Sequence, residues 1–187
     1  ISIYDSENKK YFDLNIDIEK EVVVIGKDEP KIIAKLPQKK EPKSQISQVI
    51  GSGTGFYVND NGYIITNNHV VEKCDQVLLN SNPIELISVN KTIDLALLRS
   101  DNTKNPFLYL RQSEIKQGED IVVIGYPFGK EISSEAKITK GIISSLIGIG
   151  NDETKIQIDA AIQPGNSGGP TIGMDGKVVG VTVASAN

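Results

Sequence analysis

A serine stands among glycines near the C-terminal end of the chain, in the stretch Gly165-Asn166-Ser167-Gly168-Gly169-Pro170. A serine hydroxyl is a weak nucleophile unless a neighbouring base takes its proton. An attacking serine also needs fixed donors for the oxyanion that forms on the substrate carbonyl. Gly165 allows a tight turn before the serine, so that the backbone N–H groups of Gly165 and Ser167 could point into one small hole. The alternative is a glycine-rich hairpin loop without chemistry.

Proton transfer near neutral pH by an unperturbed side chain would have to use His69, because it is the single histidine of the chain. Histidine is the side chain that changes its charge near neutral pH without perturbation. His69 follows Thr66-Asn67-Asn68 directly after a predicted strand, where we expect a single helical turn over residues 67–73. The alternative is an ordinary surface or core histidine.

An acid stands at the start of a very apolar strand, in Thr92-Ile93-Asp94-Leu95-Ala96-Leu97-Leu98. A carboxylate beside apolar residues is costly unless a partner satisfies it. The Nδ1–H of His69 is a suitable partner, because that bond leaves Nε2 free to accept the serine proton. The alternative is that Asp94 caps a turn before the strand.

Composition limits the other functions. The 187 residues suffice for one large or two small domains. A formal net charge of −4, with no basic face, argues against nucleic-acid binding. No apolar run is long enough to span a bilayer. Cys74 is the single cysteine, so no intramolecular disulfide is expected, and one histidine with one cysteine cannot build a typical zinc site. We therefore expect neither metal nor cofactor.

The order of elements predicts an all-β fold. Many short strands with turn residues between them follow residue 46, including strands at 76–79, 84–89, 95–99 and 107–110. Residues 59–62 predict a hairpin turn, and residues 136–147 one bent strand or two. Residues 1–44 form a β-rich segment, with a strand at 31–36 and a charged linker with two prolines at 37–44. We place a domain boundary there, with the second domain at 45–187. The first segment is either a regulatory element or a tail.

Several segments in this order resemble the chymotrypsin-like serine proteases, and among them the HtrA type. They read GSGTGFYVNDNGYIITNNHVV, TIDLALL, GEDIVVIGYPFG, KITKGIISSL and IDAAIQPGNSGGPTIGMDGKVVGV, and they extend from about residue 49 to residue 181. The resemblance implies two six-stranded antiparallel β-barrels. It implies a serine endopeptidase that acts on unfolded or exposed polypeptides.

Carried over residue by residue, the resemblance implies that Ser167 is the nucleophile, His69 the general base and Asp94 the orienting acid. It implies an oxyanion hole shaped by Gly165, Asn166 and Ser167. The pocket for the residue before the scissile bond would be bordered by Ile162, Gln163, Pro164, Thr182, Val183 and Ala184. Because no acid stands there, we expect a preference for small to medium apolar side chains.

The family pattern also implies a last strand, a C-terminal helix and a PDZ domain beyond the segment matched here. We therefore expect a chain truncated at its C-terminus. The resemblance favours a homotrimer and an extracytoplasmic, periplasmic setting. The alternative function is a catalytically inactive binding or scaffold protein that keeps the protease fold.

Overall fold

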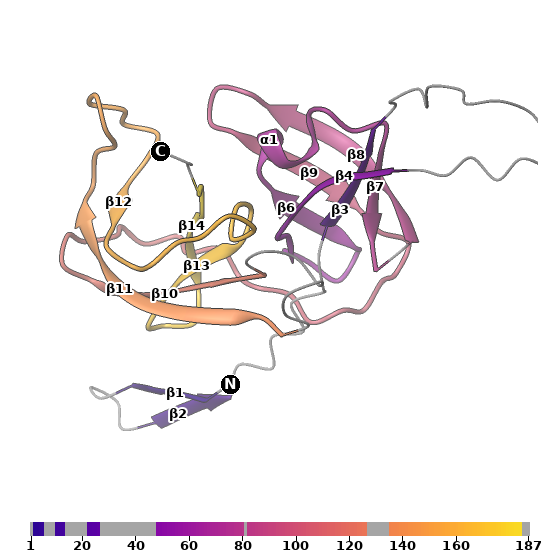
Figure 1. The fold of residues 1–187 in the computed structure, drawn as a ribbon. Helices are drawn as coiled ribbons and strands as arrows, with labels where there is room; N and C mark the ends of the chain where they lie inside the picture. The colour runs from indigo at the N-terminus through magenta and orange to yellow at the C-terminus, as the bar shows by residue number, and fades with distance from the viewer. Residues whose placement is uncertain are drawn as a thin grey trace, which may run out of the picture.

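The computed structural model of this chain is almost entirely β (Figure 1). It describes residues 2–5, 10–13, 22–26, 48–80, 82–126 and 135–184. The predicted strand at 31–36 and the linker at 37–44, with the domain boundary placed there, lie outside these residues. β1 (Ser2–Asp5) and β2 (Lys10–Asp13) pair antiparallel, and with no other described strand.

The first large sheet has seven described strands in the order β4-β3-β7-β8-β9-β6-β5, all antiparallel. They are β3 (Val22–Gly26), β4 (Gln48–Gly53), β5 (Phe56–Tyr57), β6 (Tyr63–Thr66), β7 (Gln76–Leu79), β8 (Asn82–Asn90) and β9 (Leu95–Arg99). β3 comes from the N-terminal segment and pairs with both β4 and β7.

Alternation along these strands builds the first core. In β6 and β9 every second residue is buried, as expected for strands with one face inward. Ile64 is 1% exposed and Leu98 is 0% exposed. The predicted hairpin turn joins β5 to β6: Asn59 Oδ1 accepts the Asn61 and Tyr63 N–H groups, and Gly62 takes a positive φ of 85°.

The second sheet has five described strands in the order β12-β11-β10-β13-β14. They are β10 (Asp120–Gly125), β11 (Lys137–Ser145), β12 (Gln157–Ile158), β13 (Pro170–Gly173) and β14 (Val178–Val181). Both sheets curl, and they lie side by side in Figure 1. The predicted all-β class with two antiparallel barrels is confirmed, although the described strands divide seven and five rather than six and six.

A shared core joins the two sheets. Phe56 from β5 packs in one cluster with residues of β10, β13 and β14, among them Ile124 and Ile172. This junction brings the loops at the ends of the two sheets together.

The predicted strand at 107–110 is wrong, because this segment crosses between the sheets without joining either as a strand. The Leu108 N–H donates to Tyr57 O at 3.0 Å in the first sheet. The Val178 N–H in the second sheet donates to Tyr109 O at 2.9 Å, and Leu110 forms only an isolated bridge to Val178. Leu108 belongs to the core at the junction and Phe107 packs against the first core, whereas Tyr109 and Leu110 are exposed. The segment at 136–147 is a single strand, β11.

Candidate active site

His69 lies on the one-turn helix α1 (Asn68–Val71), which directly follows β6. The helical turn predicted over residues 67–73 is therefore present. Asn67 precedes it with extended dihedrals, and the Glu72 N–H closes the turn on Asn68 O at 2.8 Å. The short helix places the imidazole at the end of the first sheet, where 40% of its side chain is exposed.

Asp94 meets His69 with both carboxylate oxygens. Oδ2 lies 2.6 Å from His69 Nδ1, and Oδ1 accepts the His69 backbone N–H at 2.9 Å. Against a carboxylate, Nδ1 carries the proton, so Nε2 is left as the acceptor. The predicted pairing of the histidine with this acid is thus present in the structure.

The backbone of Asp94 is held as firmly as its side chain. Asp94 has a positive φ of 56°, a region that Asp tolerates better than most residues. Its carbonyl oxygen accepts Asn67 Nδ2 at 2.9 Å and the Asn68 N–H at 3.2 Å. The residues before His69 therefore fix the position of the acid that contacts it.

The turn before Ser167, residues 163–166, has the signature of a type II turn. The Asn166 N–H donates to Gln163 O at 3.0 Å, Pro164 stands at the second position, and Gly165 at the third has a φ of 95°. Neither the Gly165 nor the Ser167 N–H donates a hydrogen bond within the described part of the chain. Two amides next to the serine hydroxyl thus remain available to a ligand. We call this element the Gly165 turn.

Asn166 fills the space beneath this turn. It is 4% exposed, and its Oδ1 is buried without a hydrogen-bond partner among the described residues. A Cβ on Gly125, at the end of β10, would approach Asn166 Cα within 2.9 Å. Asn166 therefore contributes volume beneath the turn, and Gly125 makes room for it.

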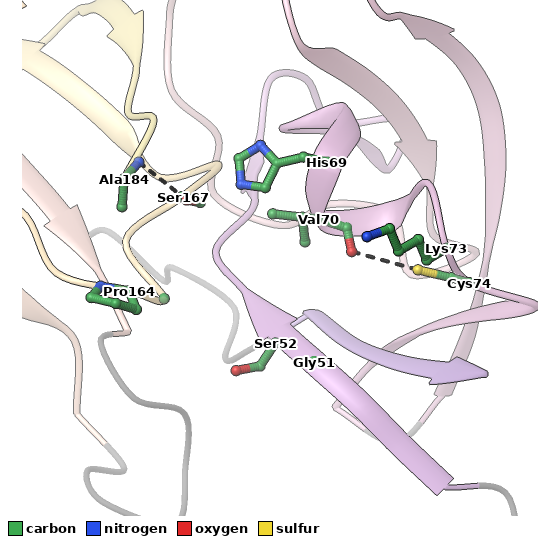
Figure 2. Close-up of a pocket in the computed structure, with 10 residues that line it drawn as sticks. Gly51, Ser52, His69, Val70, Lys73, Cys74, Pro164, Ser167 and Ala184 are labelled. Atoms are coloured by element: carbon green, nitrogen blue, oxygen red, sulfur yellow. Dashed lines mark hydrogen bonds between the residues drawn. The ribbon is translucent and has the colours of Figure 1, made fainter. Parts of the chain in front are cut away.

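Ser167 and His69 line one pocket of about 290 Å³ (Figure 2). The other residues around it are Gly51, Ser52, Val70, Lys73, Cys74, Pro164, Gly165 and Ala184. No hydrogen bond joins Ser167 to His69 in the described structure. Instead, Ser167 Oγ accepts the Ala184 N–H at 3.2 Å, as the dashed line in Figure 2 shows.

The residues expected around the substrate take different positions. Pro164 and Ala184 line the pocket with Ser167, whereas Ile162, Gln163 and Val183 do not. The Thr182 side chain is 3% exposed, and its hydroxyl lies 3.0 Å from that of Thr171 inside the second sheet. Thr182 thus contacts the core with its side chain and the serine loop with its backbone.

Sequence reasoning missed the pocket wall formed by β4 and α1. Gly51 and Ser52 come from β4, whereas Lys73 and Cys74 follow α1. β4 and the end of α1 lie far from Pro164 and Ala184 in the sequence, and only the folded structure brings them to the same pocket. Burial raises the pKa of the Cys74 thiol, and the nearby carboxylates of Asp75 and Glu72 raise it further, so this thiol is a poor nucleophile at neutral pH.

The fold and these loops define a class of protein. Residues 53–181 match the model of the trypsin-like peptidase domain, and the chain belongs to this family. A probable periplasmic serine endoprotease DegP-like from Chlamydia pneumoniae is 38% identical over 159 residues, which cover 80% of this chain and 31% of the relative. The resemblance to HtrA and DegP proteins drawn from the sequence motifs is confirmed.

Solved structures agree with this assignment. The serine endoprotease from Yersinia pestis gives a TM-score of 0.63 at 26% identity, over 88% of this chain and 53% of that chain. An HtrA-type protease, AlgW, solved with a tripeptide, gives a TM-score of 0.63 at 27% identity. The match covers 86% of this chain and 48% of that chain. This chain thus spans about half the length of each of these solved chains, and 31% of the length of the relative from Chlamydia pneumoniae.

Two further findings concern membranes and metals. Among the residues that the structure describes, no helix is long and apolar enough to cross a bilayer. Within the same ranges, no group of three or more His, Cys, Asp or Glu side chains gathers into a metal site.

Proposed function

We propose that this chain is the protease domain of a serine endopeptidase that cleaves exposed or unfolded polypeptides. Ser167 attacks the scissile carbonyl, His69 takes its proton through Nε2, and Asp94 holds the imidazole and stabilises its charged form. One observation carries the proposal. Asp94 makes two hydrogen bonds to His69, and the imidazole of His69 lines the same pocket as Ser167.

The oxyanion would lie against the Gly165 and Ser167 N–H groups. Both are without a partner in the described structure, and both flank the nucleophile. Fixed amide donors stabilise the charge that develops on the carbonyl oxygen, and they need no reorganisation during the reaction. Asn166 supports these amides from below, since its side chain is buried beneath the turn.

The acyl side of the substrate would meet Pro164 and Ala184, the two residues expected there that line the pocket with Ser167. Within the described residues no acid lines the pocket. We expect small to medium apolar side chains before the scissile bond. A substrate strand that binds through its backbone to an exposed edge would add affinity with little sequence preference.

The test uses the purified protein and its Ser167→Ala variant. A fluorophosphonate should label the parent and not the variant, and casein digestion should fall by about 10⁴-fold or more in the variant. Labelling that persists in the Ser167→Ala variant would remove Ser167 from the mechanism. Equal melting temperatures of the two proteins would show that the loss is chemical.

A second candidate is a binding protein that keeps the protease fold without catalysis. One observation favours it: Ser167 Oγ bonds to the Ala184 N–H and not to His69. In this case neither labelling nor digestion occurs in the parent, while peptides still bind. In apo enzymes such catalytic contacts are often long and tighten only with substrate, so we prefer the enzyme.

The setting and assembly are also proposals. The DegP-like relative is named periplasmic, which supports an extracytoplasmic site for this protein. The family resemblance suggests a homotrimer. Fractionation of cells that express the native gene would test the compartment, and light scattering the assembly. A cytosolic monomer would contradict both.

A further inference from the structure

Thr54 is buried where the two sheets meet, and nothing in the proposed reaction requires it. It lies between β4 and β5 and is 0% exposed. Its hydroxyl donates to Gly165 O at 2.7 Å, across 111 positions of the chain. The same oxygen accepts the Tyr126 N–H at 3.0 Å, just after β10.

The backbone of Thr54 makes two more long-range bonds. Its N–H donates to Ser167 O at 2.8 Å, and its carbonyl accepts the Thr66 hydroxyl at 2.8 Å. Thr66 is 0% exposed and ends β6, directly before the segment that carries His69. Every polar group of Thr54 is therefore bonded, and its partners come from both sides of the candidate active site.

The hydroxyl bond fixes one particular peptide group. The peptide between Gly165 and Asn166 has its N–H bonded to Gln163 O and its C=O bonded to Thr54. This peptide lies between the two proposed oxyanion donors, Gly165 N–H before it and Ser167 N–H after it. The bond from the Thr54 N–H to Ser167 O then fixes the far side of the nucleophile.

Space around Thr54 is as restricted as its bonding. A Cβ at position 168 would lie 2.1 Å from Thr54 O, and one at position 169 would lie 3.2 Å from Thr54 Cγ2. The two glycines after Ser167 thus let the serine loop lie directly against Thr54. The close packing leaves the loop little room to move, and the buried hydrogen bonds of Thr54 add to this restriction, because buried polar groups that lose their partners cost free energy.

From this geometry we infer that Thr54 is a positioning residue for the oxyanion hole. This inference rests on the proposed function and deepens it. The hydroxyl keeps the Gly165 turn in its type II form, so the Gly165 N–H stays directed to the substrate. Without the hydroxyl, the peptide between Gly165 and Asn166 keeps only one of its two anchors, and the turn can rearrange.

The test compares Thr54→Ala with Thr54→Ser, which both lose the methyl group but differ in the hydroxyl. We expect Thr54→Ala to lower kcat by roughly 10- to 100-fold with KM changed less than about threefold, because oxyanion donors act on the transition state. Thr54→Ser should restore kcat to within about threefold of the parent. Rates are taken per titrated active site, so that a loss of folded protein does not enter them.

A second measurement is independent of catalysis. The ¹H–¹⁵N signal of the Gly165 amide should shift in Thr54→Ala and return in Thr54→Ser. An unmoved Gly165 signal in Thr54→Ala, or a Thr54→Ser variant as slow as Thr54→Ala, would overturn the inference. If the parent itself resists the fluorophosphonate, the proposed function fails, while the Gly165 signal still decides the role of Thr54.

Discussion

The two halves of the candidate active site are built in opposite ways. On the nucleophile side, Thr54, Asn166 and Ser167 are 0%, 4% and 6% exposed, and buried backbone bonds hold the loop. On the base side, the His69 and Asp94 side chains are 40% and 21% exposed. One half is fixed by the fold before any substrate arrives, and the other half is in contact with water.

A bound substrate therefore changes the two sides of the site differently. Donors that are fixed beforehand stabilise an oxyanion at no further cost of ordering. Water competes for an exposed hydrogen bond, so the His69–Asp94 contact gains strength when a bound peptide excludes solvent. The contact between Ser167 and His69 is absent from the described structure, in which Ser167 Oγ accepts the Ala184 N–H and keeps its own O–H free for the imidazole. Substitutions on the two sides should therefore differ in size and in kind.

The largest effect is expected on the base side, from Asp94→Asn. The amide keeps the size of the side chain but no longer selects the tautomer with its proton on Nδ1, so kcat should fall by roughly 10³- to 10⁴-fold. Steady-state hydrolysis of a peptide substrate measures it. Asp101→Asn, at an exposed aspartate outside the pocket, is the matched control and should stay within about twofold, as expected of a surface substitution away from the site. A variant at position 94 that retains a tenth of the parent kcat would contradict the proposed role.

A smaller effect is expected on the nucleophile side, from Gly165→Ala. The φ of 95° at Gly165 is strained for alanine, which favours a type I turn and turns the N–H away. We expect kcat to fall by roughly 10- to 100-fold. Gly118→Ala is the control, because Gly118 has a similar φ of 82° and no atom near a Cβ.

Both glycine variants should lose similar stability, about 1–2 kcal/mol, since the backbone strain is the same in kind. Thermal melting measures this loss, and active-site titration separates it from catalysis. If Gly118→Ala slowed the reaction as much as Gly165→Ala, the Gly165 N–H would have no special place in the mechanism.

The same contrast explains what the sequence could predict. His69, Asp94 and Ser167 stand at strand ends in residue types that suit proton transfer, so local patterns pointed to them. Thr54 has an ordinary residue type, and its role depends on contacts made across 111 positions. A local pattern carries no information about such a contact.

The segment at 107–110 shows the same limit in the fold. Its apolar residues predicted a strand, because alternation and burial are read from the segment alone. In the structure, the backbone groups of Leu108 and Tyr109 bond to different sheets. Leu108 is apolar because it packs at the junction of the sheets, whereas Tyr109 and Leu110 are 67% and 46% exposed.

The smallest effect is expected at Cys74, a second possible nucleophile on the same pocket as Ser167. Burial raises the pKa of this thiol above its ordinary value of 9.0, with further increases from Asp75 and Glu72. The reactive thiolate is therefore scarce at neutral pH, and its amount increases about tenfold per pH unit until the raised pKa is reached. Alkylation by iodoacetamide, followed by mass spectrometry, should be slow at pH 7 and should accelerate with each pH unit, with the increase continuing beyond pH 9.

Cys74→Ser should leave kcat and fluorophosphonate labelling within about twofold of the parent, because the proposed mechanism uses Ser167 and not this thiol. Rapid alkylation at pH 7 would mean that the thiol is ionised despite its burial. Combined with loss of hydrolysis in Cys74→Ser, it would move the nucleophile from the rigid half of the site to the α1 side. The contrast between a fixed nucleophile and an exposed base would then be wrong.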